Sequence, residues 1–506
     1  MRPIALLTLA FPVALAAQTA TTSSAAPFKA RPLASGRVRI GPAKGTVVVV
    51  GGGAMGPEIY KAFIDAAGGP DALILDVPNA GGADTVSAST GKPWRDHGAH
   101  DVAVLFTKDR KVADSDSFTA IIKRAGGVWF EGGRQFHLVQ DYGGTKTERA
   151  IMDLLERGGV VGGSSAGASI LGDFMVRGAP SSDNTIMDYP GYETGFGYLR
   201  NVGIDQHVVA RSRLSDLADS IITRYPTMLG ISVDEGTSWI IRGDTGRIVG
   251  RNKAFVYNGT ESDAGAPFLT LYPGDRYDLN ARRVISRAAD RSPVKPELIA
   301  SLFGKYDDPA LGGATVLVAQ DGDVYVDRAF GIPANARYMP RTTLPQFPLG
   351  GISRVFTELC AQSSSVARGN GAGQESGAGA RRARSESSVW PLQSCVARLS
   401  VPVGAHRTVA VDSQQVQSSV DELYRFALGL DVPGTWTNAD YSKGWTSDTY
   451  KGVTRLASYA TADGKRAAFV RIPERRATVI ILTNDASADA RGMSERILDR
   501  LLGALR

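Results

Sequence analysis

The 506-residue chain has few cysteines and little excess charge, and beyond its N-terminus it has no long apolar run. Two cysteines exclude a disulfide-dense scaffold and any zinc site built from four cysteines. The net charge of +6 is spread along the chain, which indicates ordinary surface charge and no nucleic-acid partner. Because a span needs about 20 apolar residues, we expect no membrane span.

What remains is an ordinary globular composition, with 43% hydrophobic and 21% charged residues. These values exclude a disordered, collagen-like or wholly coiled-coil chain. At roughly 100–200 residues per domain, the length predicts two to four domains.

The N-terminus has the pattern of a secretory signal peptide. Residues 1–17 have a short basic start, an apolar centre and small residues at Ala14, Ala16 and Ala17. Residues 18–35, rich in Ala, Ser, Thr and Pro, read as a linker. We therefore expect export to a periplasm or the medium, where Cys360 and Cys395 could pair.

Residues 36–290 predict one α/β domain. Mostly apolar strands alternate with glycine turns and helices, which is typical of a parallel sheet covered on both faces. We expect strands at 46–50, 72–77, 101–106, 127–130 and 159–161, and helices at 58–67, 118–125 and 147–157.

Residues 293–506 predict a smaller second domain of α+β type. A hairpin is expected at 314–319 and 324–329, with further strands at 467–471 and 478–483 and helices at 420–430 and 492–505. Residues 362–388 form a Gly/Ala/Ser/Arg tract without apolar periodicity, which indicates a flexible insertion.

One pentapeptide has the pattern of a catalytic turn. Gly163-Ser164-Ser165-Ala166-Gly167 matches G-x-S-x-G, follows an apolar strand and precedes residues that can form a helix. Such a strand–turn–helix lifts the serine above the sheet and aims the following N–H at a developing oxyanion. A plain glycine-rich turn has the same composition, so the pentapeptide alone is moderate evidence.

A nucleophilic serine needs a base and an acid that orients the base. His207 stands at the end of an expected strand, whereas the remaining four histidines are more simply explained as surface, packing or second-region residues: His97, His100, His137 and His406. The apolar run 230–233 ends in Asp234 and Glu235. Because strand ends at one edge of a parallel sheet converge, these groups indicate a site together with Ser165.

Several linked motifs over about residues 36–290 resemble the cyanophycinase and dipeptidase E group of serine peptidases. They occur in the order of that family and comprise Gly51-Gly52-Gly53, 128–135 (VWFEGGRQ), 162–168 (GGSSAGA), Asp205-Gln206-His207 with Arg211 and Arg213, and Asp234-Glu235-Gly236-Thr237.

The resemblance implies a flavodoxin-like α/β fold, similar to class I amidotransferase domains. It implies that Ser165 is the nucleophile and His207 the general base, with Glu235 as the acid and Asp234 as second choice. Gly133 and Ala166 would supply the oxyanion N–H groups. The substrate-binding positions implied are Gln135, Asp205, Gln206, Arg211 and Arg213.

The cyanophycinase branch cleaves β-aspartyl linkages in which arginine hangs on an aspartate backbone. Such a pocket needs a cation for the α-carboxylate, for which Arg211 or Arg213 is suited, and a carboxylate such as Asp205 for the guanidinium. Two positions depart from the family pattern: Arg134 replaces an aspartate, and Asp216 replaces a basic residue. Both put the polymer cyanophycin in more doubt than the hydrolytic mechanism.

The second region faintly resembles β-lactamase-related serine hydrolases. Residues 312–331 resemble their opening hairpin, and 347–357 resemble the segment that holds S-x-x-K. Gly351 stands at the nucleophile position and Arg354 at the lysine position. Because glycine offers no nucleophile and arginine is too basic to act as a base, we expect a degenerate module that binds peptide or cell-wall material, or only braces the first domain.

The leading hypothesis is an exported serine peptidase that hydrolyses β-aspartyl linkages through an acyl-enzyme. The alternatives are an aspartyl dipeptidase of dipeptidase E type, a non-catalytic binding protein, and a β-lactamase-like hydrolase, against which Gly351 and Arg354 argue. A peptide substrate is expected, whereas no metal or other cofactor is expected, since no ligand spacing occurs. The sequence leaves a homodimer open.

Overall fold

The structure is a computed structural model. It describes residues 39–263, 265–308, 311–331, 347–348, 352–353, 355, 410–411, 416–430, 444–462 and 464–503. The expected signal peptide, linker and flexible insertion lie outside these residues, as do Cys360, Cys395, Gly351 and Arg354. Among the residues described, no helix combines the length and the apolar character that crossing a membrane requires.

A nine-stranded mixed sheet forms the centre of the first part of the chain, in the order β14-β13-β10-β9-β1-β5-β4-β2-β3. Its parallel half comprises β1 (Thr46–Val50), β2 (Ile74–Val77), β3 (Val102–Val104), β4 (Gly127–Phe130) and β5 (Val160–Ser164). Its antiparallel half comprises β9 (Thr237–Arg242), β10 (Thr245–Gly250), β13 (Arg276–Asp278) and β14 (Arg283–Ser286).

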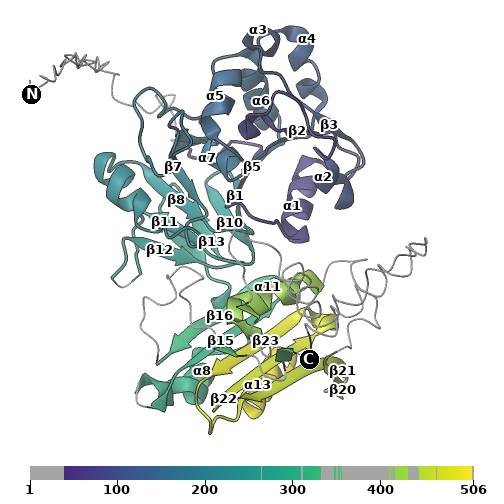
Figure 1. The fold of residues 1–506 in the computed structure, drawn as a ribbon, viewed down its shortest axis with the longest axis vertical. Helices are drawn as coiled ribbons and strands as arrows, with labels where there is room; N and C mark the ends of the chain where they lie inside the picture. The colour runs from purple at the N-terminus through teal and green to yellow at the C-terminus, as the bar shows by residue number, and fades with distance from the viewer. Residues whose placement is uncertain are drawn as a thin grey trace, which may run out of the picture.

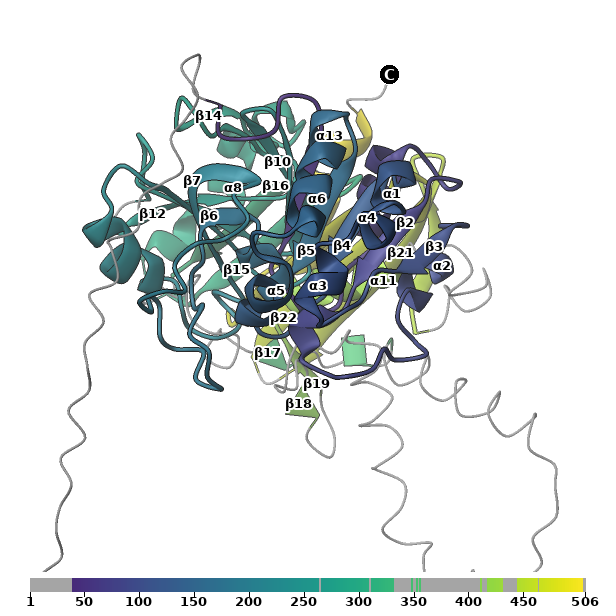
Figure 2. The ribbon, with the colours of Figure 1, turned by 90° about the horizontal axis from the view of Figure 1, so that it is seen from above.

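Helices cover both faces of the parallel half, as expected for apolar parallel strands. One face packs on α1 (Pro57–Ala67) and α2 (Lys92–Asp96) through Val48 and Val50, and the other packs on α5 (Gln135–Tyr142) and α6 (Lys146–Glu156) through Val47 and Val49. Figures 1 and 2 show these helices around the sheet. The shorter helices are α3 (Arg110–Ala113), α4 (Asp116–Thr119), α7 (Ala166–Ser169), η1 (Asn79–Gly81) and η2 (Ile122–Arg124).

The single helix expected at 118–125 is wrong in detail, because α4 ends at Thr119 and a separate 3-10 turn follows. The Thr119 hydroxyl bonds back to the Ser115 carbonyl (3.1 Å), and Ala125 is already extended (φ −68°, ψ 143°). Gly126 then donates to the Leu73 carbonyl (2.9 Å) as the chain enters β4. The short connection leaves no room for a continuous helix.

A second sheet, of five strands, was not anticipated. Its order is β12-β11-β8-β7-β6, with β6 (Gly172–Phe174), β7 (Leu199–Gln206), β8 (Leu229–Val233), β11 (Ala254–Tyr257) and β12 (Phe268–Leu271). One face shares the large apolar core of the first sheet, and the other packs on the π-helix η3 (Leu217–Ile222). The first part of the chain is therefore an α/β unit built on two sheets.

The second part contains a six-stranded antiparallel sheet, in the order β16-β15-β23-β22-β21-β20. Alternate residues of its strands face α11 on one side and α13 with α8 on the other, giving three layers. The bounds are β15 (Ala314–Gln320), β16 (Asp323–Phe330), β20 (Thr446–Tyr450), β21 (Val453–Ala462), β22 (Lys465–Ile472), β23 (Ala477–Thr483), α8 (Pro296–Phe303), α11 (Val420–Leu430) and α13 (Ala490–Gly503). Short elements are η4 (Ala289–Arg291), η5 (Gly304–Asp307), η9 (Pro473–Arg475), β17 (Phe347–Pro348), β18 (Ala410–Val411) and β19 (Val416–Ser418).

Ion pairs join the two parts, which lie at opposite ends of the long axis in Figure 1. Asp323 at the start of β16 accepts from Arg247 of β10 (3.4 Å), and also from Arg291 of the nearby turn η4 (2.7 Å). Lys253 contacts Asp327 (2.8 Å), with both side chains largely buried. The six-stranded sheet is thus fastened to the antiparallel half of the first part.

Candidate active site

Ser165 lies in the sharp turn between β5 and α7, with an unusual backbone conformation (φ 56°, ψ −114°). The turn is crowded: a Cβ on Gly163 would come 2.2 Å from the Gly167 carbonyl oxygen, and one on Gly167 would come 2.1 Å from the Phe130 carbonyl oxygen. Only glycine fits at both positions. The strained, small-residue turn is the geometry expected of a nucleophile elbow.

A hydrogen-bonded chain runs from Ser165 through His207 to Glu235. His207 Nε2 lies 2.8 Å from Ser165 Oγ, and His207 Nδ1 lies 2.6 Å from Glu235 Oε1. The imidazole is 5% exposed and the carboxylate residue 2%. Because a carboxylate can only accept at Nδ1–H, the other ring nitrogen is left to accept the serine proton. The arrangement can generate a serine nucleophile.

The three groups come from two sheets, which corrects the expectation of a single sheet edge. Ser165 follows β5 of the nine-stranded sheet, whereas His207 follows β7 of the five-stranded sheet. Glu235 lies in the turn through which the chain passes from β8 of the smaller sheet to β9 of the larger one. The site is therefore built where the sheets meet.

The glycine turn after β1 joins the two halves of the site. The Gly51 carbonyl accepts from His207 N (3.0 Å), and the Gly52 carbonyl accepts from Gly236 N (2.8 Å). The Asn252 carboxamide also donates to the Glu235 backbone carbonyl. These bonds fix the base and the acid relative to the first strand.

The structure brings Glu235, and not Asp234, to the histidine. Asp234 Oδ1 accepts from the Ala210 backbone N–H (3.0 Å), on the segment after His207. Of the other histidines, His97 stacks on Tyr60 with the ring centroids 3.9 Å apart, and exposed His100 contacts Asp71 (2.8 Å). His137 lies in α5, and His406 is outside the described residues.

One predicted oxyanion residue, Ala166, adjoins the serine, and the other, Gly133, follows a glycine that lies beside it. Ala166 is the first residue of α7. A Cβ on Gly132 would lie 3.4 Å from the Ser165 Cβ, which places the loop after β4 beside the nucleophile. The next residue, Gly133, has φ 148°, and a Cβ there would come 2.0 Å from the Ala80 carbonyl oxygen.

The predicted substrate residue Asp205 is occupied within the protein. It is fully buried, and its carboxylate accepts two hydrogen bonds from Arg177, each 2.9 Å long. Arg177 also contacts Asp216 (2.7 Å). Sequence analysis missed Arg177, which lies in no motif; the acidic residue at 216, where the family has a base, was the signal that a compensating cation exists.

The other predicted substrate residues differ in exposure. Gln135 is buried, and its amide donates to the Val176 carbonyl (2.5 Å). Gln206 is buried near Ser169 (3.5 Å). Arg213 is buried and donates to Asn184 Oδ1 (2.8 Å), and its burial, reinforced by the nearby Arg177 guanidinium, lowers its pKa. Arg211 is exposed at the surface.

Two acidic side chains lie together just before the oxyanion loop. Burial, with the Glu131 charge second, raises the pKa of Asp76 to about 7. Burial also raises the pKa of Glu131, which hydrogen-bonds with Asp76. Asp76 Oδ2 accepts from the Gly91 backbone N–H (2.9 Å). Among the described residues, no cluster of three or more His, Cys, Asp or Glu side chains could hold a metal.

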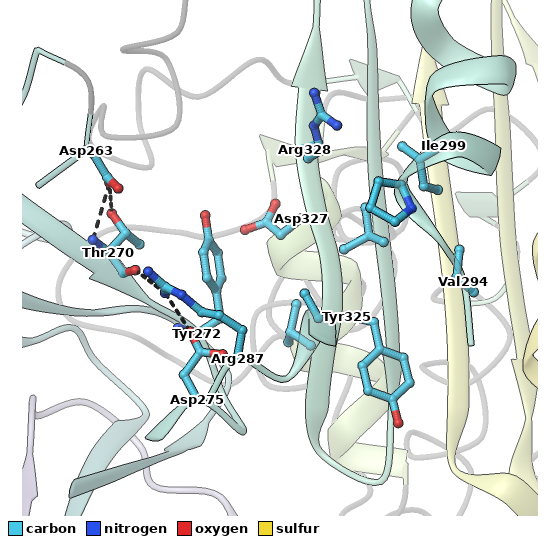
Figure 3. Close-up of a pocket in the computed structure, with 14 residues that line it drawn as sticks. Asp263, Thr270, Tyr272, Asp275, Arg287, Val294, Ile299, Tyr325, Asp327 and Arg328 are labelled. Atoms are coloured by element: carbon cyan, nitrogen blue, oxygen red, sulfur yellow. Dashed lines mark hydrogen bonds and ion pairs between the residues drawn. The ribbon is translucent and has the colours of Figure 1, made fainter. Parts of the chain in front are cut away.

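A separate pocket of about 390 Å³ lies between the two parts of the chain, and it shares no lining residue with the Ser165 site (Figure 3). Two of its carboxylates are in ion pairs: Asp275 contacts Arg287, which also lines the pocket (2.8 Å), and Asp327 contacts Lys253 (2.8 Å). Tyr272 and Tyr325 add aromatic surface. The pocket is therefore a gap at the interface between the two parts of the chain.

An α/β fold with an elbow serine bonded to a buried histidine defines a serine hydrolase. The model of peptidase family S51 matches residues 47–249. A cyanophycinase of Synechococcus elongatus is 30% identical over 263 residues, covering 48% of this chain and 81% of the relative. A cyanophycinase of Geminocystis herdmanii (strain PCC 6308) is 28% identical over 222 residues, covering 43% and 81%. The crystal structure of a peptidase from an acI-B1 Actinobacterium is 23% identical, with a TM-score of 0.38, covering 46% of this chain and 97% of that one.

The chain belongs to peptidase family S51 and is a serine-type peptidase. The family assignment made from the linked motifs is confirmed.

Proposed function

We propose that the protein hydrolyses β-aspartyl peptide linkages, with Ser165 as nucleophile, His207 as general base and Glu235 as the acid that orients it. The hydrogen-bonded chain Ser165–His207–Glu235 carries the proposal. The β-aspartyl bond is taken from the cyanophycinases to which the chain is similar.

In the acylation step, Ser165 Oγ attacks the side-chain carbonyl of the aspartyl residue while its proton passes to His207 Nε2. The carbonyl electron pair moves onto the oxygen, which the backbone N–H groups of Gly133 and Ala166 are proposed to stabilise. As the C–N bond breaks, the imidazolium returns the proton to the leaving amine. Water, activated by the same histidine, then hydrolyses the ester and regenerates the serine.

The variants Ser165→Ala and Ser164→Ala test both the nucleophile and the β-aspartyl substrate. A fluorophosphonate probe is expected to label the wild type and Ser164→Ala, but not Ser165→Ala. The same pattern is expected for release of amine from β-aspartyl dipeptides. Labelling of Ser165→Ala at another serine would overturn the assignment of the nucleophile. Hydrolysis of α-aspartyl but not β-aspartyl dipeptides would favour the aspartyl dipeptidase alternative.

We also propose that residues 293–506 act as a non-catalytic brace. Support comes from the ion pairs of Asp323 with Arg247 and of Asp327 with Lys253, which tie the described strands of this region to the peptidase part. Export, proposed from residues 1–17, is tested by the mass of the mature protein recovered from the periplasm or medium.

A further inference from the structure

The guanidinium of Arg177 is held on every side by the protein. Nε and Nη2 donate to the two oxygens of Asp205 (2.9 Å each), Nη2 also donates to Asp216 (2.7 Å), and Nη1 donates to the Asn184 carbonyl (2.8 Å). Arg177 is 2% exposed and has a left-handed backbone (φ 58°). An arginine bonded in this way is held in one position.

This ion pair is linked to the elements that carry the Ser165 site. Asp205 lies on β7, two residues before His207, which follows the strand. The segment that carries Arg177 is hydrogen-bonded to the two residues that follow Gly133. The Val176 carbonyl accepts from Gln135 (2.5 Å), and the Ala179 carbonyl accepts from Arg134 (3.0 Å). Arg177 is therefore tied to the strand that leads to His207, and its segment is tied to the residues that follow the loop beside Ser165.

The pair removes the carboxylate that would recognise an arginine side chain. Both Asp205 oxygens are already in a bidentate arrangement, the strongest geometry available to a guanidinium and a carboxylate. A substrate guanidinium would have to displace Arg177 or approach it as a like charge, and both routes are unfavourable in a buried setting. Asp216, the second acidic group, is turned to the same internal cation.

Two buried polar atoms of predicted substrate residues have no hydrogen-bond partner within the described residues: the neutral acceptor Gln206 Oε1 and the cationic donor Arg213 Nη1. Arg213 is 7% exposed, and within the described residues its Nη1 has no hydrogen-bond partner, although Nη2 is bonded to Asn184. A buried guanidinium N–H without an acceptor costs free energy, and a substrate carboxylate would remove that cost by accepting a charge-assisted hydrogen bond. Burial, and next the Arg177 guanidinium, lower the pKa of Arg213, while Asp205 and Asp216 act in the opposite direction.

We propose that Arg177 is a specificity-determining residue that supplies an internal guanidinium to Asp205, so that the site rejects arginine-bearing β-aspartyl peptides and selects, through Arg213, those whose second residue carries a carboxylate. This inference rests on the proposed function and deepens it. Acidic isoaspartyl dipeptides are thus the substrate class, and arginine-bearing polymer is not.

The test compares β-Asp-Glu, β-Asp-Leu and β-Asp-Arg. Their Kd values are measured by calorimetry on Ser165→Ala, and their kcat/KM values on the wild type. We expect β-Asp-Glu to be preferred over β-Asp-Arg at least tenfold in both. Arg177→Gln should shift that ratio at least tenfold toward arginine, whereas Arg224→Gln, which breaks an exposed ion pair with Asp188, should leave it unchanged. Arg213→Gln should weaken β-Asp-Glu most.

If Arg177→Gln is too unstable to be assayed, two further measurements test the inference. Asp216→Asn, at a partly exposed carboxylate, keeps the Arg177–Asp205 pair and should preserve rejection of arginine. Arg177→Ala should gain thermal stability from millimolar guanidinium beyond that from equal sodium chloride, because the cation refills the site. A wild type that prefers β-Asp-Arg, or a folded Arg177→Gln with an unchanged ratio, overturns the inference.

The outcomes also separate this inference from the proposed function. Absence of hydrolysis with the tenfold binding order intact on Ser165→Ala would defeat the proposed reaction and support the inferred ligand class. Hydrolysis of all three dipeptides with no discrimination would support the reaction and defeat the inference. Binding of none of them would defeat both.

Discussion

Gly52 lies directly against the imidazole of His207. A Cβ atom on Gly52 would come 2.1 Å from His207 Cε1 and 2.3 Å from Nε2, the nitrogen that faces Ser165. Gly52 also has φ +95°, a conformation that disfavours any side chain. Because Gly52 has no side chain, the turn after β1 leaves room for the His207 imidazole.

Gly52→Ala is expected to lower kcat/KM by at least 100-fold, because the methyl group displaces the histidine from the serine. The matched control is Gly69→Ala, which has φ +104° but open space around the added Cβ. It should cost about 1 kcal/mol of stability from backbone strain and leave kcat/KM unchanged. Steady-state kinetics with denaturant unfolding separates the two effects; equal activity in both variants would contradict the packing argument.

Glu235→Gln is expected to lower kcat by about 10²–10⁴-fold, because an amide at this place no longer stabilises the imidazolium or selects its tautomer. KM should change little. Asp234→Asn is the control, since an asparagine oxygen can still accept from the Ala210 N–H. A larger loss of kcat in the Asp234 variant would reverse the two assignments.

The serine turn could be predicted because its signal is local. Gly163, Ser165 and Gly167 are fixed by contacts within a few residues of β5 and α7 or with the neighbouring strand. The strand at 46–50 and the helix at 420–430 were likewise predicted with the observed bounds, because each has a continuous apolar or amphipathic pattern. The family motifs then supplied the histidine and the glutamate.

The second sheet and Arg177 could not be predicted in the same way. Strands β7 and β8 carry apolar patterns that fit a parallel sheet, but the pattern does not say which sheet they join. The partners of Asp205 depend on a residue 28 positions earlier, in a loop without periodicity. Long-range pairing of charged groups has no local signature, so a motif alone assigned Asp205 to the substrate.

The Asp76–Glu131 pair predicts a fall in stability with rising pH. Burial raises the folded-state pKa of Asp76 from 3.8 to about 7, so the folded protein holds a proton that the unfolded chain releases. Its contribution is therefore complete below about pH 4, declines as the pH rises and is lost above about pH 7, a change of roughly 2–4 kcal/mol.

Asp76→Asn mimics the protonated acid and should flatten this decline, so that the variant is more stable than the wild type at pH 8. Its amide oxygen can still accept from the Gly91 N–H. Urea unfolding at several pH values from 4 to 8 measures the effect. Asp101→Asn, at an exposed carboxylate, is the control and should follow the wild type. A parallel decline in the Asp76 variant would show that other groups cause it.

Asp323 tests how firmly the second part braces the first. It accepts from Arg291 (2.7 Å) and Arg247 (3.4 Å), while the next residue, Val324, donates to the Pro273 carbonyl (3.0 Å). Because both arginines are substantially exposed, Asp323→Asn should lower the free energy of unfolding by only about 0.5–1 kcal/mol. A double-mutant cycle with Arg247→Met, on β10 of the first part, should recover part of that value as coupling between the two parts. Coupling near zero would mean that the parts are held by apolar and backbone contacts, and the proposed brace would not depend on this ion pair.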